Sequence, residues 1–230
     1  MAKFLYGINA LLAWAATALS FTLNISGYYL DHVDPSRPTI LGNVPEGIAT
    51  PLERFFDWIT YFTIWSNVIV AITMTALFLR PDLFTRRGAS GFRWRVVRLD
   101  SLIMITVTGV VFNLLLSSSK TGIDAVSNGL LHVWVPIITM VVWLLAGPRG
   151  YIRMSTVWAS LVIPVVWLVF ALVRGSAVGA YPYPFLDVAT KGWASVLSFV
   201  FAMVIAAIVL AVVLKAIDAL IRRFTGGELA

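Results

Sequence analysis

The stretch WASVLSFVFAMVIAAIVLAVVLKAI (residues 193–217) decides the fold class of this chain. It is almost entirely apolar and carries one charged residue, Lys215, close to its end. An α-helix needs about 20 mostly apolar residues to cross the hydrocarbon core of a bilayer. We therefore expect this stretch to form a membrane-spanning helix.

Five further stretches meet the same requirement, approximately residues 7–30, 55–79, 101–119, 128–147 and 155–174. The composition agrees, because 60% of the 230 residues are hydrophobic and only 12% are charged. A soluble domain is about half apolar and about a quarter charged. We predict an all-α, polytopic integral membrane protein in which residues 1–230 form a single bundle of six transmembrane helices.

The first span has some features of a cleavable signal peptide. Lys3 gives it a basic start, and residues 16–18 read Ala-Thr-Ala, which resembles a cleavage site. However, the apolar run continues to Tyr28 and Tyr29, whereas the apolar core of a signal peptide has only about 7–15 residues. We expect the span to be retained.

Basic residues predict the orientation of the bundle. Most Lys and Arg residues lie in the N-terminal segment and in every second segment after it, including a cluster from Arg86 to Arg98. The positive-inside rule places these segments, and with them both termini, in the cytoplasm. Orientation thus explains the net charge of +6 better than nucleic-acid binding does. A site for anionic lipids or a partner in the Arg86–Arg98 cluster is an alternative interpretation.

Several kinds of chemistry are disfavoured by the residues present. The chain has no cysteine, so it has neither disulfides nor thiolate ligands. One histidine within a span is too few ligands for a metal site, and we predict no cofactor. A Gly-x-Ser-x-Gly motif is absent, and no carboxylate lies in the middle of a predicted span, as an ion relay would usually require.

Polar side chains within spans are costly unless they are paired or functional. At a rise of about 1.5 Å per residue, Thr63 and Asn67 of the second span fall in the outer half of the membrane. The same estimate places Asn24, Asn113 and His132, from the first, third and fourth spans, in that half. Four helices thus bring their strongest polar groups to one leaflet.

The polar residues of the second span share one face. Thr60, Thr63 and Asn67 follow the spacing i, i+3, i+7, and Ser66 lies beside them. The opposite face is apolar, so we expect this polar stripe to point into the bundle.

His132 lies in an unusual stretch of the fourth span. Asn128, four residues earlier, shares its face. Pro136 has no N–H group, so the carbonyl of His132 loses its helical partner and the helix should bend. Such breaks are tolerated where backbone is buried in protein or lines a wet cavity. We expect a free acceptor beside the imidazole.

A hydroxyl and an imidazole in one pocket suit acyl transfer, with Thr63 as nucleophile and His132 as base. Neighbouring polar groups would bind substrate, orient the imidazole or stabilise an oxyanion. The residues predicted for these roles are Asn24, Ser66, Asn67, Asn113 and Asn128. The alternative stays open, because membrane threonines commonly bond their own helix or join helices, and a lone histidine often only packs.

The predicted pocket lies between the first four spans, opens toward the outer leaflet and is capped by residues 175–192. Phe, Trp, Leu and Val would line it, so its ligand should be a lipid or a long acyl chain. A non-catalytic lipid-binding or transport protein would use the same pocket, whereas a purely structural scaffold would have none. No feature indicates an oligomeric state.

Three motifs resemble one known family. They are YFTIWSN (residues 61–67), NGLLH (residues 128–132) with Pro136 beyond it, and YPFLD (residues 183–187). In order and position they are similar to signatures of the androgen-induced gene family of integral membrane proteins. That family includes the androgen-dependent regulators of tissue factor pathway inhibitor and a large bacterial branch. Six spans also match, so the resemblance covers nearly the whole chain.

The resemblance implies a function. Animal members are multipass threonine hydrolases that cleave fatty-acid esters of hydroxy fatty acids, with a Thr in span two and a His in span four. Here these residues correspond to Thr63 and His132. The implied protein is a lipid-ester hydrolase of a bacterial plasma membrane. Ser66-Asn67, the short spacing to Pro136 and the outer loop 31–54 differ from the animal members, so the resemblance does not specify the ester.

Overall fold

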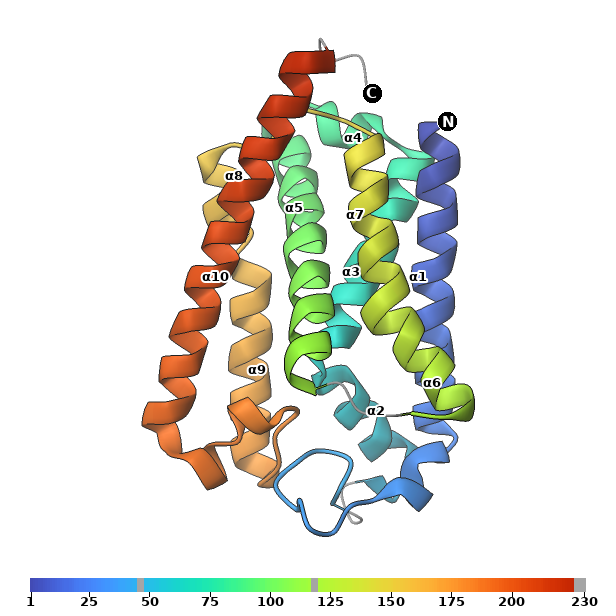
Figure 1. Cartoon of the computed structure of the whole chain (residues 1–230), viewed down its shortest axis with the longest axis vertical. Helices are drawn as coiled ribbons and strands as arrows, with labels where there is room; N and C mark the ends of the chain where they lie inside the picture. The colour runs from blue at the N-terminus through green and yellow to red at the C-terminus, as the bar shows by residue number, and fades with distance from the viewer. Residues whose placement is uncertain (45–47, 117–119, 226–230) are drawn as a thin grey trace.

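A computed structural model describes residues 1–230 except 45–47, 117–119 and 226–230. The described chain is all-α (Figure 1). Within it, six helical stretches are long and apolar enough to cross a membrane, and they pack together. They are Ala2–Ile25, Phe62–Leu79, Gly88–Leu116, Gly122–Leu145, Met154–Val178 and Val188–Thr225. The prediction of an all-α integral membrane protein with six spanning helices is confirmed.

The spans are built from the following elements. The helices within the spans are α1 (Ala2–Ile25), α3 (Phe62–Leu79), α5 (Gly88–Val111), α6 (Gly122–Gly129), α7 (Val135–Leu145), α8 (Met154–Ala159), α9 (Val162–Val178) and α10 (Val188–Thr225). The π-helical turn η3 (Phe112–Leu116) extends α5, and a second, η4 (Leu130–Trp134), joins α6 to α7. Four further elements lie outside the spans: η1 (Tyr28–His32), α2 (Pro51–Thr60), α4 (Asp82–Thr85) and η5 (Pro184–Leu186).

The start of α1 and the end of α10 lie at the same end of the bundle, together with α4 (Figure 1). The opposite end carries α2, η1 and the connection from α9 to α10. We refer to these as the inner and outer ends, in keeping with the orientation that the basic residues predict. An even number of crossings brings the start of the first spanning helix and the end of the last to the same end, as found here.

The tightest part of the bundle lies between α1 and α3. Ala13 and Ala16 of α1 are fully buried in one cluster with Val70 and Ala71 of α3. Small side chains let membrane helices approach closely. Large apolar side chains are exposed on the outer surface of the bundle, where lipid would cover them.

The second span begins later than predicted. Residues 51–60 form the separate helix α2, which starts with a capping box between Thr50 and Glu53. Tyr61 is extended (φ −74°, ψ 131°), so the helix breaks there and α3 begins at Phe62. Consequently Thr63 lies in the first turn of a helix, and Thr60 belongs to α2 and not to the polar stripe of α3.

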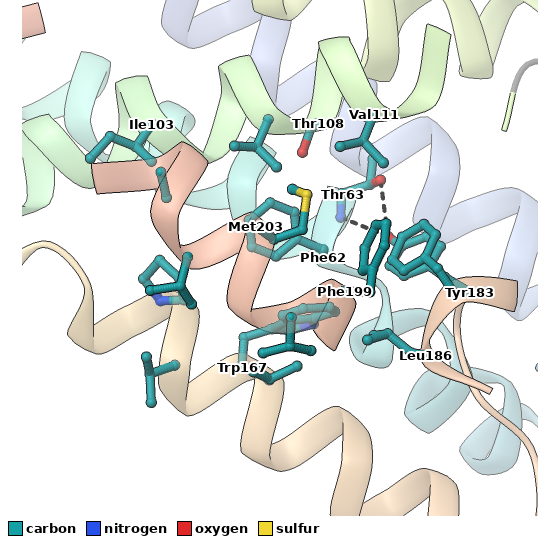
Figure 2. Close-up of a pocket in the computed structure, with 18 of the residues that line it drawn as sticks. Phe62, Thr63, Ile103, Thr108, Val111, Trp167, Tyr183, Leu186, Phe199 and Met203 are labelled. Atoms are coloured by element: carbon teal, nitrogen blue, oxygen red, sulfur yellow. Dashed lines mark hydrogen bonds between the residues drawn. The ribbon is translucent and has the colours of Figure 1, made fainter. Parts of the chain in front are cut away.

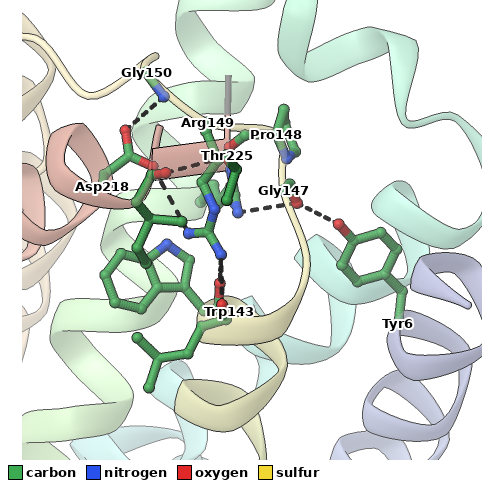
Figure 3. A network of polar contacts seen from close by, with 11 residues as sticks. Tyr6, Trp143, Gly147, Pro148, Arg149, Gly150, Asp218 and Thr225 are labelled. Carbon is green, nitrogen blue, oxygen red and sulfur yellow. Dashed lines mark hydrogen bonds and ion pairs between the residues drawn. The ribbon is translucent and has the colours of Figure 1, made fainter. Parts of the chain in front are cut away.

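A buried polar network connects several elements at the inner end of the bundle (Figure 3). Arg149, in the connection after α7, lies 3.8 Å from the Asp218 carboxylate of α10, and both side chains are inaccessible or nearly so. The Gly150 N–H donates to the same carboxylate at 2.7 Å. The Tyr6 hydroxyl of α1 donates to the Gly147 carbonyl. The network therefore ties α10, the connection after α7 and α1 together.

Candidate functional site

Thr63 and His132 meet between the second and fourth spans. The Thr63 Oγ1 atom lies 3.1 Å from His132 Nε2. Thr63 belongs to the first turn of α3 and is 8% exposed, whereas His132 lies in the π-helical turn η4 and is half-buried. The structure thus brings together the two residues predicted to act as nucleophile and base.

The break at Tyr61 explains why the Thr63 hydroxyl is free to face an imidazole. A threonine inside a membrane helix usually bonds the carbonyl four residues earlier, as Thr75 does with Ala71 at 2.7 Å. For Thr63 that position is Ile59, which belongs to α2. The Ile59 carbonyl instead accepts from the Trp65 indole at 2.8 Å.

The tautomer of His132 follows from its second contact. Its Nδ1 lies 3.1 Å from the main-chain carbonyl oxygen of Asn128. Because a carbonyl can only accept, Nδ1 carries the proton and Nε2 presents its lone pair to Thr63. This is the arrangement that a general base requires. A main-chain atom of Asn128 therefore orients the imidazole, while its side chain donates to the Asp124 carboxylate at 2.8 Å.

Phe112 fixes the plane of the imidazole. Its ring stacks on His132 with centroids 3.7 Å apart and an interplanar angle of 12°. Phe112 begins the π-helical turn η3 at the outer end of α5. Sequence reasoning missed this residue, because an apolar aromatic in an apolar span gives no signal of its own.

The carbonyl freed by Pro136 has a partner. Asn113 donates from Nδ2 to the His132 carbonyl at 3.2 Å and to the Gly109 carbonyl at 2.7 Å. A Cβ atom on Gly109 would lie 3.0 Å from Pro136 Cβ, so glycine allows α5 to approach here. Asn113 therefore holds the backbone of His132 and does not contact the imidazole through a hydrogen bond.

Ser66 and Asn67 hold the backbone of Thr63. Ser66 Oγ donates to the Thr63 carbonyl at 2.9 Å and lies 2.8 Å from Thr108 Oγ1 on α5. Asn67 Nδ2 donates to the Thr63 carbonyl at 2.8 Å and to the Leu131 carbonyl at 3.3 Å. Both side chains are fully buried. They hold the backbone of Thr63, and their own donors are used within the bundle.

Thr63 borders an apolar cavity of about 160 Å³ (Figure 2). Its walls come from α3, α5, α9, α10 and the turn around η5, and include Phe62, Trp167, Phe199 and Met203. The prediction that the first four spans enclose the pocket is wrong. Small residues close α1 onto α3, whereas bulky side chains line the space on the other side of α3.

Asn24 lies away from this cavity. It borders a second, small cavity of about 30 Å³ at the outer end, together with Arg54, Asp57 and Tyr61. Among the described residues, its Oδ1 has no hydrogen-bond partner. The structure therefore does not bring Asn24 into the site with Thr63.

Tyr183 is the polar residue that sequence reasoning missed. Its hydroxyl lies 3.4 Å from Thr63 Oγ1 and accepts from the Thr63 N–H at 3.4 Å. Burial raises the pKa of Tyr183, although the contacts with Thr63 lower it, so the phenol stays protonated. The YPFLD motif was the available signal, but in the sequence it indicates only a stiff turn.

The segment that carries Tyr183 is anchored to the outer loop. Asp187 accepts from the Thr39 hydroxyl at 2.6 Å and from the Thr190 hydroxyl at 2.7 Å. Burial opposes its ionisation, but these hydrogen bonds lower the pKa of Asp187. The Leu41 N–H also donates to the Tyr181 carbonyl at 2.9 Å. The turn predicted to cap the pocket thus lies at its outer end in a fixed position.

In the described part of the chain, no group of three or more His, Cys, Asp or Glu side chains is placed to hold a metal ion.

Comparisons of the chain with protein-family models, with curated proteins and with solved structures found no match. The likeness to the androgen-induced gene family therefore rests on the three sequence motifs. In the structure the three motifs meet at one place, because Thr63 of the first motif contacts both His132 of the second and Tyr183 of the third.

Proposed function

We propose that this protein hydrolyses carboxylic esters of lipids within the membrane, with Thr63 as nucleophile and His132 as general base. One observation carries the proposal: the Thr63 hydroxyl, released from its own helix, lies 3.1 Å from the unprotonated nitrogen of His132 at the wall of an apolar cavity. A nucleophile bonded to a base that is itself oriented by a third group is the common pattern of acyl transfer.

The surroundings of Thr63 favour a lipid substrate. Aromatic and aliphatic side chains dominate the lining of the cavity, and Thr63 is one of its few polar residues. A long acyl chain fits such a lining, because burial of apolar surface drives its binding. Its ester carbonyl would lie at Thr63. Fatty-acid esters of hydroxy fatty acids, which the motif resemblance implies, belong to this class.

The reaction proceeds in two halves. The Thr63 oxygen attacks the ester carbonyl carbon while its proton passes to His132 Nε2, and the carbonyl oxygen becomes an oxyanion. The oxyanion then collapses, the bond to the alcohol oxygen breaks, and the imidazolium protonates the departing alcohol. This leaves an acyl-threonine. A water molecule repeats the attack with His132 as base, which releases the carboxylic acid and restores Thr63.

A second candidate is a non-catalytic lipid-binding or lipid-transport protein. The lining of the cavity favours it, and so does the absence of an oriented carboxylate: among the described residues no carboxylate bonds the imidazole. The nearby Asp124 carboxylate instead accepts from the Asn128 side chain and the Tyr29 hydroxyl and pairs with Lys120. A binding protein would retain the lipid unchanged, whereas a hydrolase releases acid and alcohol.

Turnover of acyl esters by the purified protein in detergent tests the proposal. We expect wild-type protein to release free fatty acid, and Thr63→Ala and His132→Ala to lose at least about 10³-fold in kcat, because removing a member of such a pair abolishes most of the chemistry. A fluorophosphonate probe should label the wild type and spare Thr63→Ala.

Thr73→Ala is the matched control. Thr73 lies on the same helix, is fully buried and does not line the cavity. It should retain wild-type turnover. Full turnover or labelling in Thr63→Ala would show that Thr63 is a packing residue, and lipid binding without release of acid by the wild type would favour the transport candidate.

A further inference from the structure

Attack on an ester generates an oxyanion, and an efficient site offers it hydrogen-bond donors that are already in place. We propose that the Tyr183 hydroxyl and the Thr63 backbone N–H together form this oxyanion hole. The inference rests on the hydrolase function proposed above. Sequence reasoning had assigned this role to asparagines of the second to fourth spans.

The asparagine amides are already engaged. Asn67 Nδ2 donates to two carbonyls, those of Thr63 and Leu131. Asn113 Nδ2 likewise donates to main-chain carbonyls, at 2.7 and 3.2 Å. The Asn128 amide donates to Asp124. Turning any of these groups toward a substrate would leave a carbonyl of the bundle without its donor, at a cost comparable to a lost hydrogen bond.

The Thr63 N–H is available because of the break before α3. The first N–H groups of a helix have no intrahelical acceptor, and Thr63 is the second residue of α3. Its hydrogen-bond partner is the Tyr183 hydroxyl, at a long 3.4 Å. The positive end of the helix dipole also favours negative charge at this point.

Tyr183 places a second donor next to the Thr63 N–H. Its hydroxyl lies 3.4 Å from both Thr63 N and Thr63 Oγ1, and its ring lines the cavity (Figure 2). Both distances exceed the usual 2.9–3.0 Å of protein hydrogen bonds. The two donors would therefore give up only a weak mutual contact when they turn to a substrate oxygen. Because burial raises its pKa, the phenol carries its proton at neutral pH.

The phenol is held in position before any substrate arrives. The Tyr183 ring stacks on Phe185, with centroids 5.1 Å apart, and packs edge-on against Tyr61 at 5.9 Å. Asp187 then anchors the same turn to Thr39 of the outer loop. A donor fixed in this way needs no reorganisation during the reaction, which is the condition for strong stabilisation.

Tyr183→Phe tests the inference, with Tyr61→Phe as its matched control. Tyr61 packs edge-on against Tyr183, and its hydroxyl donates to the Leu41 carbonyl at 3.0 Å, away from Thr63. We expect Tyr183→Phe to lower kcat by about 10²–10³-fold, the usual effect of losing one oxyanion donor. Its KM, its affinity for a non-hydrolysable ether analogue of the ester and its thermal midpoint should stay near those of the wild type. Fluorophosphonate labelling should slow in parallel with kcat, and Tyr61→Phe should leave kcat unchanged.

Two results would overturn the oxyanion assignment but would leave the proposed ester hydrolysis by Thr63 and His132 standing. The first is wild-type kcat in Tyr183→Phe when Thr63→Ala is inactive. The second is a loss of ether-analogue affinity and thermal midpoint that accounts for the loss of kcat, which would make Tyr183 a packing residue. Full turnover in Thr63→Ala would instead remove the hydrolase itself, and the oxyanion hole with it.

Discussion

The position of Thr63 relative to a helix end decides what its hydroxyl can do. Thr17, like Thr75, bonds the carbonyl four residues earlier, at 2.8 Å. Thr63 follows a break, so its hydroxyl contacts His132 and its N–H contacts Tyr183. One extended residue, Tyr61, thus leaves both the hydroxyl and the N–H of Thr63 without an acceptor in their own helix.

Thr63→Ser provides a test at this scale. Serine keeps the oxygen that attacks and loses only the methyl group, so we expect it to retain measurable ester turnover where Thr63→Ala shows none. A reduced rate is expected, because the serine side chain has more rotamer freedom than the β-branched threonine. The measurement is release of free fatty acid by each purified variant. Equal inactivity of both variants would indicate that the methyl group, not the oxygen, is what the site requires.

At the scale of elements, the site depends on irregularities in otherwise regular helices. The fourth span widens into a π-helical turn at His132, the third ends in another at Phe112, and the second starts only after α2. Such π-helical turns occur frequently at functional sites. In the inner half of the bundle, a buried contact of Asp218 joins α10 to the connection after α7.

Asp218→Ala should destabilise this connection. Arg149 is fully buried, and removing its carboxylate leaves an uncompensated charge and the Gly150 N–H without an acceptor. Breaking one side of such a pair costs about 3–5 kcal/mol in the free energy of unfolding. We expect a lower thermal midpoint in detergent. Asp82→Ala is the control, because Asp82 pairs with Arg86 at the surface and its loss should change the midpoint little. An unchanged midpoint in Asp218→Ala would contradict the network's role in stability.

At the scale of the whole molecule, the functional groups gather at the outer end of the bundle while the basic residues gather at the inner end. Thr63, His132 and Tyr183 lie near the outer turns, whereas the cluster from Arg86 to Arg98 lies around α4 and the start of α5. A lipid ester in the outer leaflet would therefore meet the site near its polar headgroup region.

Cysteine labelling tests the orientation. The chain has no native cysteine, so a single substitution gives an unambiguous signal. Ser90→Cys, at the exposed start of α5, should react with a membrane-impermeant maleimide only after the cells are permeabilised. Ser36→Cys, exposed in the outer loop, should react in intact cells. The reverse pattern would invert the bundle and place the site in the inner leaflet.

The sequence by itself determined the class of the fold and singled out two residues that the structure brings into contact. Apolar runs of spanning length specify helices in a bilayer, because the backbone must satisfy its hydrogen bonds internally there. Thr63 and His132 stood out because polar groups within such runs are costly. Pro136 also indicated an irregular helix, because it lacks an N–H group, and a π-helical turn does precede α7.

Only the tertiary structure decided which helices surround the cavity, and which groups contact Thr63 and His132. Closure of α1 onto α3 and the space beside α10 depend on how side chains from distant segments fit together, which periodicity does not encode. Phe112 and Tyr183 reach the site from the third span and from the turn before α10. Neither residue is unusual in its own segment, and their roles arise from distances that exist only in the folded chain.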